Sequence, residues 1–250
     1  MPQGQHTSRV YESELRTLRD RLLLMGSLVE ELVGKAMLSL STRDTALARS
    51  TMKMDRRINR LECEIDELCM RILATRQPVA SDLRFVTTAL KIVTDLERIG
   101  DLGVNICERV AELNGDAPLP PVGDLGGLAD EATGVVHEAL DALVEQDVER
   151  ATALLSRDDG IDAHYAHIFE RLLELMTRDS TTIYRATRIQ SIAKYLERIG
   201  DHAMNIAEKV VFLVKGKDIR HRNLRSDSGP PGSPEPPELE LADVADMKPR

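Results

Sequence analysis

Apolar residues recur along most of this chain at alternating spacings of three and four. This period places them on one face of an amphipathic helix. The pattern stops at residues rich in turn chemistry and then restarts, so it predicts three helices, a connector and three more helices. The apolar positions that define these six helices span residues 15–36, 54–72, 85–110, 135–143, 161–175 and 183–210.

Turn and capping residues give the expected ends of these helices. Asp44 supplies an N-cap before the second helix, and Asp82 supplies one before the third. Pro78 ends the second helix, because the residue before a proline is disfavoured in the helical conformation. Asn114 with Gly115 predicts a C-cap for the third helix, and Gly216 one for the last.

Helices joined by short turns lie antiparallel to one another, so each trio predicts a three-helix bundle. The expected fold is all-α, with two tandem pseudo-symmetric three-helix bundles. The expected segments are a disordered N-terminus at 1–8, a first bundle at 9–114, a Pro- and Gly-rich linker at 115–127, a second bundle at 128–222 and a disordered, acidic, Pro-rich tail at 223–250.

One stretch of the sequence occurs twice, one hundred residues apart. Residues 96–110 and 196–210 agree at ten of fifteen positions without a gap. A repeat of this kind indicates a duplicated architecture. The polar residues repeat as faithfully as the apolar ones: Glu97 with Glu197, Arg98 with Arg198, Asp101 with Asp201, Asn105 with Asn205 and Glu108 with Glu208.

The repeated acids share one helix face, because residues four apart are neighbours on a helix. Glu97 and Asp101 carry like charge at this spacing, which costs about 0.2–0.5 kcal/mol in an isolated helix. A metal ion or an arginine from a neighbouring helix could offset the repulsion, whereas a solvated acidic face would need neither. Gly100, Gly103 and Gly200 lie inside the same helices and indicate close helix packing, access for a metal, or both.

The repeat extends into the middle helix of each trio, with an offset of 103. If the middle and last helices face each other, each bundle brings carboxylate pairs together. Clustered carboxylates suit Fe, Mn or Mg, whereas zinc is less favoured because no His or Cys cluster accompanies them. The aligned positions are Asp55 with Asp158, Asn59 with Asp162, Glu62 with Tyr165 and Asp66 with Phe169.

Composition narrows the class of protein. The net charge of −9 gives no electrostatic footprint for nucleic acid. No apolar run reaches the ~18 residues that a membrane-spanning helix needs, and the N-terminus lacks the apolar segment of a secretory signal. An odd count of three cysteines fits reduced thiols in the cytoplasm.

The duplicated hexapeptide LERIGD, at residues 96–101 and 196–201, resembles the signature of the PhoU family of phosphate-signalling regulators. Three flanking stretches extend the resemblance: RQP at 76–78, ASDLR at 80–84 and VKGKDIRH at 214–221. The similarity covers roughly residues 10–222 and leaves the tail outside.

The resemblance implies a cytoplasmic homodimer without enzymatic activity, built from two tandem three-helix bundles. Such a protein is a negative regulator of the phosphate regulon and of high-affinity phosphate uptake. Its implied partners are the ATPase subunit of a phosphate ABC transporter and a phosphate-sensing histidine kinase, so it is peripheral to the membrane only through them. No nucleic-acid partner is implied.

Some family members hold multinuclear iron or other metals on E(D)xxxD motifs, so the resemblance implies iron first, with Mn, Mg and Zn as alternatives. Asn59 departs from the motif, and Tyr165 and Phe169 remove a second acid pair, so we expect the two sites to bind metal unequally. The positions carried over are Glu62, Asp66, Glu97, Asp101, Asp158, Asp162, Glu197 and Asp201.

Two other functions stay open at this point. A carboxylate-bridged, di-iron-like enzyme would use the same bundle architecture, but such sites use Glu-x-x-His pairs, and neither LERIGD helix has a His at that step. A metal-free dimerisation scaffold would need none of the acids.

Overall fold

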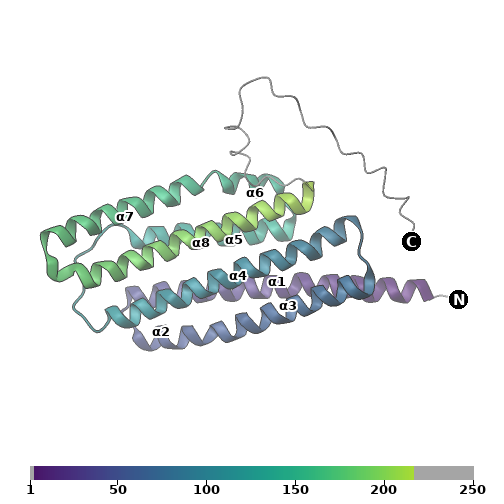
Figure 1. The fold of residues 1–250 in the computed structure, drawn as a ribbon, viewed down its shortest axis with the longest axis horizontal. Coiled ribbons are helices and arrows are strands. Elements are labelled where there is room, and N and C mark those ends of the chain that lie inside the picture. Colours follow the sequence, from purple (N-terminus) through teal and green to yellow (C-terminus); the bar gives the residue numbers. More distant parts are fainter. Residues whose placement is uncertain (1–2, 217–250) are drawn as a thin grey trace, which may run out of the picture. The chain divides into compact units, whose positions relative to one another are not determined.

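The structure, a computed structural model, describes residues 3–216 and is helical throughout its regular elements (Figure 1). Six long helices form two sets of three, which confirms the predicted all-α fold of tandem helical bundles. The first set is α1 (Gln3–Ser41), α3 (Asp55–Arg76) and α4 (Ala80–Leu113), and the second is α5 (Leu125–Glu145), α7 (Asp158–Arg178) and α8 (Ile183–Lys215).

Each half also contains a short helix between its first two long ones, α2 (Thr45–Thr51) and α6 (Val148–Leu155), which the sequence analysis did not separate. Asp44 caps α2 as predicted, because its carboxylate accepts a hydrogen bond of 2.9 Å from the backbone N–H three residues on. Asp147 caps α6 in the same way at 3.0 Å. Short 3-10 turns at Met52–Met54 and Ser180–Thr182 precede α3 and α8.

Three helix starts differ from expectation. Helix α1 begins at Gln3, inside the segment expected to lack structure, and α5 begins at Leu125, inside the expected linker. The prediction that Asp82 caps α4 is wrong, because α4 begins two residues earlier and Val79 occupies its N-cap position. The Asp82 carboxylate instead accepts a hydrogen bond of 2.8 Å from the Tyr11 hydroxyl, which joins α4 to α1.

The C-terminal ends of the helices agree with the sequence-based expectations better than the starts do. Helix α3 ends at Arg76, ahead of Pro78, and α8 ends at Lys215, where Gly216 is the C-cap as predicted, with a φ of +66° in the left-handed region that glycine favours. Asn114 holds the C-cap position of α4, but with a φ of −70° it is right-handed, so the expected left-handed cap is absent there. The expected tail at 223–250, and residues 217–222 of the expected second bundle, lie outside the described residues.

The core of each half lies between its three long helices, which pack on one another pairwise. The helical spacing of apolar residues expected at 85–110 is confirmed on α4, because Leu96, Ile99, Ile106 and Val110 have no exposed surface. Gly103 brings α4 close to α1: a Cβ there would lie 2.2 Å from Leu32 Cδ2. A larger residue at this position would therefore force the Leu32 side chain to shift.

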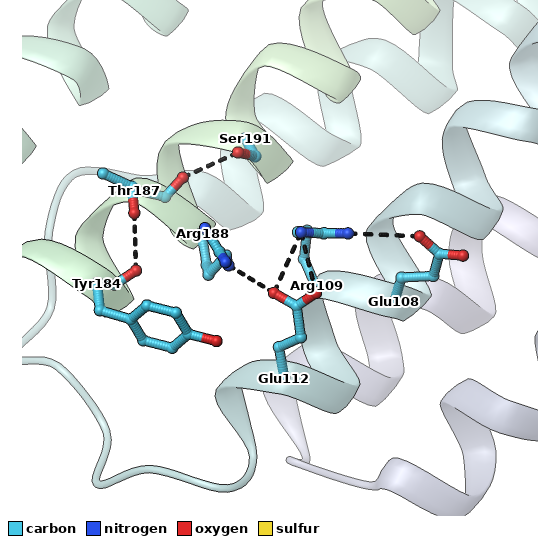
Figure 2. A network of polar contacts seen from close by, with 7 residues as sticks. All are labelled: Glu108, Arg109, Glu112, Tyr184, Thr187, Arg188 and Ser191. Carbon is cyan, nitrogen blue, oxygen red and sulfur yellow. Dashed lines mark hydrogen bonds and ion pairs between the residues drawn. The ribbon is translucent and has the colours of Figure 1, made fainter.

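The two halves meet where α4 and α8 lie side by side and antiparallel (Figure 1). Arg84 near the start of α4 donates to the carbonyl of Leu213 near the end of α8, at 3.3 Å. At the opposite end, Arg188 of α8 donates to the Glu112 carboxylate of α4 at 2.5 Å. Figure 2 shows that Glu112 also receives the Arg109 guanidinium of its own helix, so one carboxylate holds two arginines from the two halves.

A buried charged group lies between these two ends. The Asp95 side chain on α4 is 9% exposed, and its Oδ1 is 3.0 Å from Nδ1 of His202 on α8. Its other oxygen accepts from the ammonium of Lys209, two turns further along α8. Because the partners come from different halves, this group ties the halves together.

None of the described helices combines the length and the apolar character needed to cross a bilayer.

Candidate metal-binding acid clusters

The first acid cluster lies where α3 faces α4. Its α3 members are Asp55, Glu62 and Asp66, and its α4 members are Glu97 and Asp101. The two helices come close at this point because of Gly100, where a Cβ would meet Ile58 Cδ1 at 3.3 Å. The glycine of the hexapeptide thus brings the α4 acids toward the α3 acids.

Burial and repulsion between charges raise the pKa values of acids in the first cluster. Burial raises the pKa of Glu97, and the charge of Asp101 raises it further. Burial also raises the pKa of Glu62, with added contributions from Asp66 and Asp101. The pKa of Asp55 rises through burial and through the same Asp101. The charge of Asp101 thus contributes to three of these shifts, whereas the pKa of Asp66 is raised by burial.

Arg98 is the cation closest to these acids. Its Nε is 3.5 Å from Glu97 Oε2 and its Nη1 is 3.4 Å from Asp101 Oδ2. An arginine from a neighbouring helix was one of the candidates that could offset the repulsion, whereas Arg98 lies on the same helix as Glu97 and Asp101. Its side chain is 57% exposed, so water screens both pairs and leaves the repulsion inside the cluster largely uncompensated.

Two oxygen atoms on the α3 side of this cluster lack partners. Asn59 Nδ2 donates to Asp55 Oδ2 at 2.9 Å. The remaining oxygens, Asp55 Oδ1 and Asn59 Oδ1, are buried without a hydrogen-bond partner. Buried oxygens that lack a donor fit a place where a cation or water binds.

The second acid cluster lies where α7 faces α8. Ligand oxygens of Asp162, Glu197 and Asp201 all lie within 4.8 Å of one another. Gly200 permits this approach, because a Cβ there would lie 3.0 Å from Ile161 Cδ1 of α7. Glu197 is 8% exposed, and its Oε2 is buried without a hydrogen-bond partner. Among the residues that the structure describes, this is the tightest group of metal-ligand types.

The second cluster also raises the proton affinity of its members. Partial burial and the charges of Glu197, Asp158 and Asp162 raise the pKa of Asp201 to about 6. Burial and the charges of Asp162, Asp159 and Glu197 raise the pKa of Asp158. Asp158 therefore belongs to the electrostatic environment of the second cluster, although it stands outside the group within 4.8 Å.

The donor set of the second cluster fits a hard or borderline cation. All three converging side chains offer carboxylate oxygens, which Mg, Mn and Fe accept. The buried oxygen Oε2 of Glu197 has no hydrogen-bond partner, and a bound cation would supply one. Structural zinc sites instead use Cys and His.

The eight acids named from the sequence lie on the two helix pairs expected, and the structure brings three of them, Asp162, Glu197 and Asp201, within 4.8 Å of one another. Sequence reasoning did not identify every charged neighbour of these acids. It missed Lys194, whose ammonium donates to Glu197 at 2.5 Å, although the spacing of three residues on one helix was a visible signal. It also missed Asp95, because the cations that meet it lie more than one hundred residues away.

The protein thus belongs to a class of duplicated helical proteins. Each half is a three-helix bundle that carries acids on its second and third long helices. A family model described as the PhoU domain matches this chain twice, at residues 22–110 and 125–210. The chain belongs to the PhoU family. The two matches coincide with the two halves of the fold.

Individual relatives agree with this assignment. A protein of Pseudomonas putida, named phosphate-specific transport system accessory protein PhoU homolog, is 40% identical over 222 residues, which are 88% of this chain and 86% of the relative. The crystal structure of PhoU from Pseudomonas aeruginosa matches with a TM-score of 0.81 at 39% identity, over 83% of this chain and 100% of that one. PhoU from Streptococcus pneumoniae matches with a TM-score of 0.78 at 29% identity, over 84% and 99%.

Proposed function

We propose that this protein is a negative regulator of the phosphate regulon and of high-affinity phosphate uptake. It acts as an adaptor between the ATPase subunit of a phosphate ABC transporter and a phosphate-sensing histidine kinase, and it has no enzymatic activity of its own. The observation that carries this proposal is the match along nearly the whole described chain to a relative named as an accessory protein of the phosphate-specific transport system.

The helical surface supports a role in protein–protein contact. Phe169 and Leu173 lie one turn apart on α7, and their residues are 41% and 50% exposed. Exposed apolar side chains that gather on one helix face mark a contact surface more often than isolated ones do. We infer a cytoplasmic homodimer whose outer helices meet the transporter and the kinase.

The regulatory role is tested by deleting the gene in its own host and growing the strain in phosphate-rich medium. Alkaline phosphatase activity and phosphate uptake should rise, because the kinase is no longer restrained. A plasmid copy of the full chain should restore repression. Unchanged repression in the deletion strain would overturn the proposal.

The adaptor role needs a separate test of contact. Tagged full-length protein is purified from phosphate-rich and phosphate-poor cells and scored for the transporter ATPase and the kinase. We expect both partners, in amounts that change with phosphate supply. Capture of neither under either condition would show that regulation runs without direct contact.

We also propose that the two acid clusters bind a divalent or trivalent cation, with iron first and manganese or magnesium as alternatives. Support comes from the converging oxygens of Asp162, Glu197 and Asp201, and from the unpartnered Glu197 Oε2. A bound cation would supply the positive charge that the clustered acids lack. The proposed ligands of the first cluster are Glu62, Asp66, Glu97 and Asp101, and those of the second are Asp158, Asp162, Glu197 and Asp201.

A variant with four changes tests whether the clusters matter for regulation. It carries Glu97→Ala, Asp101→Ala, Glu197→Ala and Asp201→Ala. We expect a folded protein that loses bound metal and part of its repression. The matched control changes the exposed acids Glu67 and Glu170, which occupy equivalent positions of α3 and α7, to alanine. If the four-fold variant represses phosphatase as well as the control does, the clusters are only polar faces and the protein is a metal-free scaffold.

A di-iron-like enzyme is the alternative from a different class. The third residue after Glu197 is Gly200, where such an enzyme would place a ligating His. Oxygen consumption by the iron-loaded protein measures this directly. Turnover above that of free iron would favour the enzyme.

A further inference from the structure

The second acid cluster carries a cation of its own. Lys194 lies one turn before Glu197 on α8, and its Nζ donates to Glu197 Oε1 at 2.5 Å. The Glu197 side chain is 10% exposed, so the pair is poorly screened on the carboxylate side. The ammonium thus occupies one of the two oxygens of the most buried acid in the cluster.

The opposite helix holds this ammonium in place. The Tyr165 ring of α7 lies 5.1 Å from Lys194 Nζ, which is within the range of a cation–π contact. The Tyr165 hydroxyl in turn accepts a hydrogen bond of 3.0 Å from Gln190 Nε2 of α8. Lys194 is therefore positioned by two helices, unlike a free surface lysine.

The first half lacks both parts of this arrangement. Thr94 stands at the position equivalent to Lys194, and Glu62 stands at the position equivalent to Tyr165. From the first half to the second, an acid is therefore replaced by an aromatic ring, and a threonine is replaced by a lysine. In the first half a flanking arginine, Arg98, contacts the cluster at the longer distance of 3.5 Å.

We propose that Lys194 is an internal counter-cation that competes with a metal ion for the cluster of Asp162, Glu197 and Asp201. This inference rests on the proposed cation binding and adds that the second cluster is partly neutralised by the chain itself. A metal ion on Glu197 Oε2 would lie within a few ångströms of the ammonium. Two like charges at that separation repel strongly enough to weaken binding by at least about tenfold.

The test is a Mn²⁺ titration of the full-length protein, with free Mn²⁺ measured by electron paramagnetic resonance. Lys194→Met removes the charge and keeps most of the stem, so it should tighten binding at the second cluster by about tenfold or more. Lys194→Arg keeps the charge and should bind as the unchanged protein does. Adding Asp201→Asn to Lys194→Met should abolish the gain, which assigns it to the second cluster.

Each other outcome overturns the inference. Equal affinity of the Lys194→Met variant and the unchanged protein means that the ammonium does not compete. An equal gain with Lys194→Arg means that packing, not charge, is responsible. Absence of Mn²⁺ binding in every variant means that there is no metal for the ammonium to compete with. The proposed regulatory function is decided separately, by the repression of alkaline phosphatase.

If Lys194→Met fails to fold, as circular dichroism and thermal unfolding without metal would show, Lys194→Thr takes its place. This variant installs the residue that the first half carries at the equivalent position. It should show the same tightening, and its failure to do so has the same meaning.

Discussion

The two halves of this protein keep the same architecture while their equivalent positions hold different residues. Where α1 meets α4, Leu32 faces Gly103. The two family-model matches begin at residues 22 and 125, so α1 and α5 align with an offset of 103, and the equivalent positions of the second half hold Val135 and Ala203. Leu with Gly and Val with Ala contain the same number of side-chain carbons. One helix of the pair therefore carries one carbon less in the second half, and the other helix carries one carbon more. Close packing of the core explains why the two changes go together.

The acid clusters differ more freely than the cores. The first half spreads its acids along α3 and α4, whereas the second gathers three of them within 4.8 Å and adds Lys194. The glycine that brings the helices together, Gly100 or Gly200, is the same in both. Packing thus constrains how closely the helices approach at the site, whereas the charged residues on these helices differ between the halves.

The contact between the halves is not symmetric either. Asp95 of the first half meets His202 and Lys209 of the second. The position equivalent to Asp95 holds Tyr195, so the second half cannot return the contact. The predictions that follow test how far the two halves are interchangeable, from the largest expected effect to the smallest.

Asp95→Ala should have the largest effect. It leaves the Lys209 ammonium, whose side chain is 15% exposed, without its carboxylate, and breaking a buried pair in this way costs about 3–5 kcal/mol. The free energy of unfolding from urea denaturation measures the loss. Adding Lys209→Met should recover part of it, because the stranded charge is then gone.

The control for this prediction is Asp130→Ala, an exposed acid on α5. Its effect should stay within about 0.5 kcal/mol, as is usual for surface changes. A loss below about 1 kcal/mol for Asp95→Ala would mean that the asymmetric contact between α4 and α8 matters little.

Gly103→Ala should come next, because it gives the first half the residue of the second. A Cβ at this position would lie 2.2 Å from Leu32 Cδ2, and overpacking typically costs about 1–3 kcal/mol. Adding Leu32→Val should restore stability, since the pair then matches Val135 with Ala203. A double-mutant cycle on unfolding free energies measures the coupling, and strict additivity of the two changes would contradict the proposed exchange.

These comparisons show what the sequence could predict. The six long helices and the seam at Leu96 and Ile99 were accessible because a helix repeats its buried positions every three or four residues. The helix pairs that carry the acids were accessible because the motif is duplicated. Short helices such as α2 and α6 hold too few turns to show a period.

Contacts between distant residues were not accessible. Asp82 looks like an N-cap from its position, but Tyr11 of another helix uses its carboxylate. Asp95 looks like an ordinary helical acid until α8 is placed beside it. Such roles depend on which side chains meet across helices, and periodicity does not contain that information.

Asp201→Asn should stabilise the protein at neutral pH, in contrast to Asp95→Ala. The pKa of Asp201 is about 6 in the folded protein, above its ordinary value of 3.8, so the folded state binds this proton more tightly than the unfolded state. Stability linked to Asp201 is therefore present below about pH 4 and is lost as the pH rises through 6. Because Asp201 is partly exposed, the gain at pH 7.5 should be about 1 kcal/mol after allowance for screening.

Thermal unfolding in a metal-free buffer, at pH 7.5 and at pH 4, checks this prediction. The gain should be present at the higher pH and absent at the lower one. A gain of equal size at both values would point to a packing effect of the amide rather than to charge.

The capping residues provide the smallest and most symmetric test. Asp44 and Asp147 accept from the backbone N–H three residues on at 2.9 and 3.0 Å, at equivalent places in the two halves. Replacing either by alanine should cost about 1 kcal/mol, and replacing either by serine much less, because serine also accepts this bond. Urea denaturation measures both series. If the two losses differed by more than about 1 kcal/mol, the turn before α2 and the turn before α6 would have diverged as the acid clusters have, and only the helix packing would remain common to the two halves.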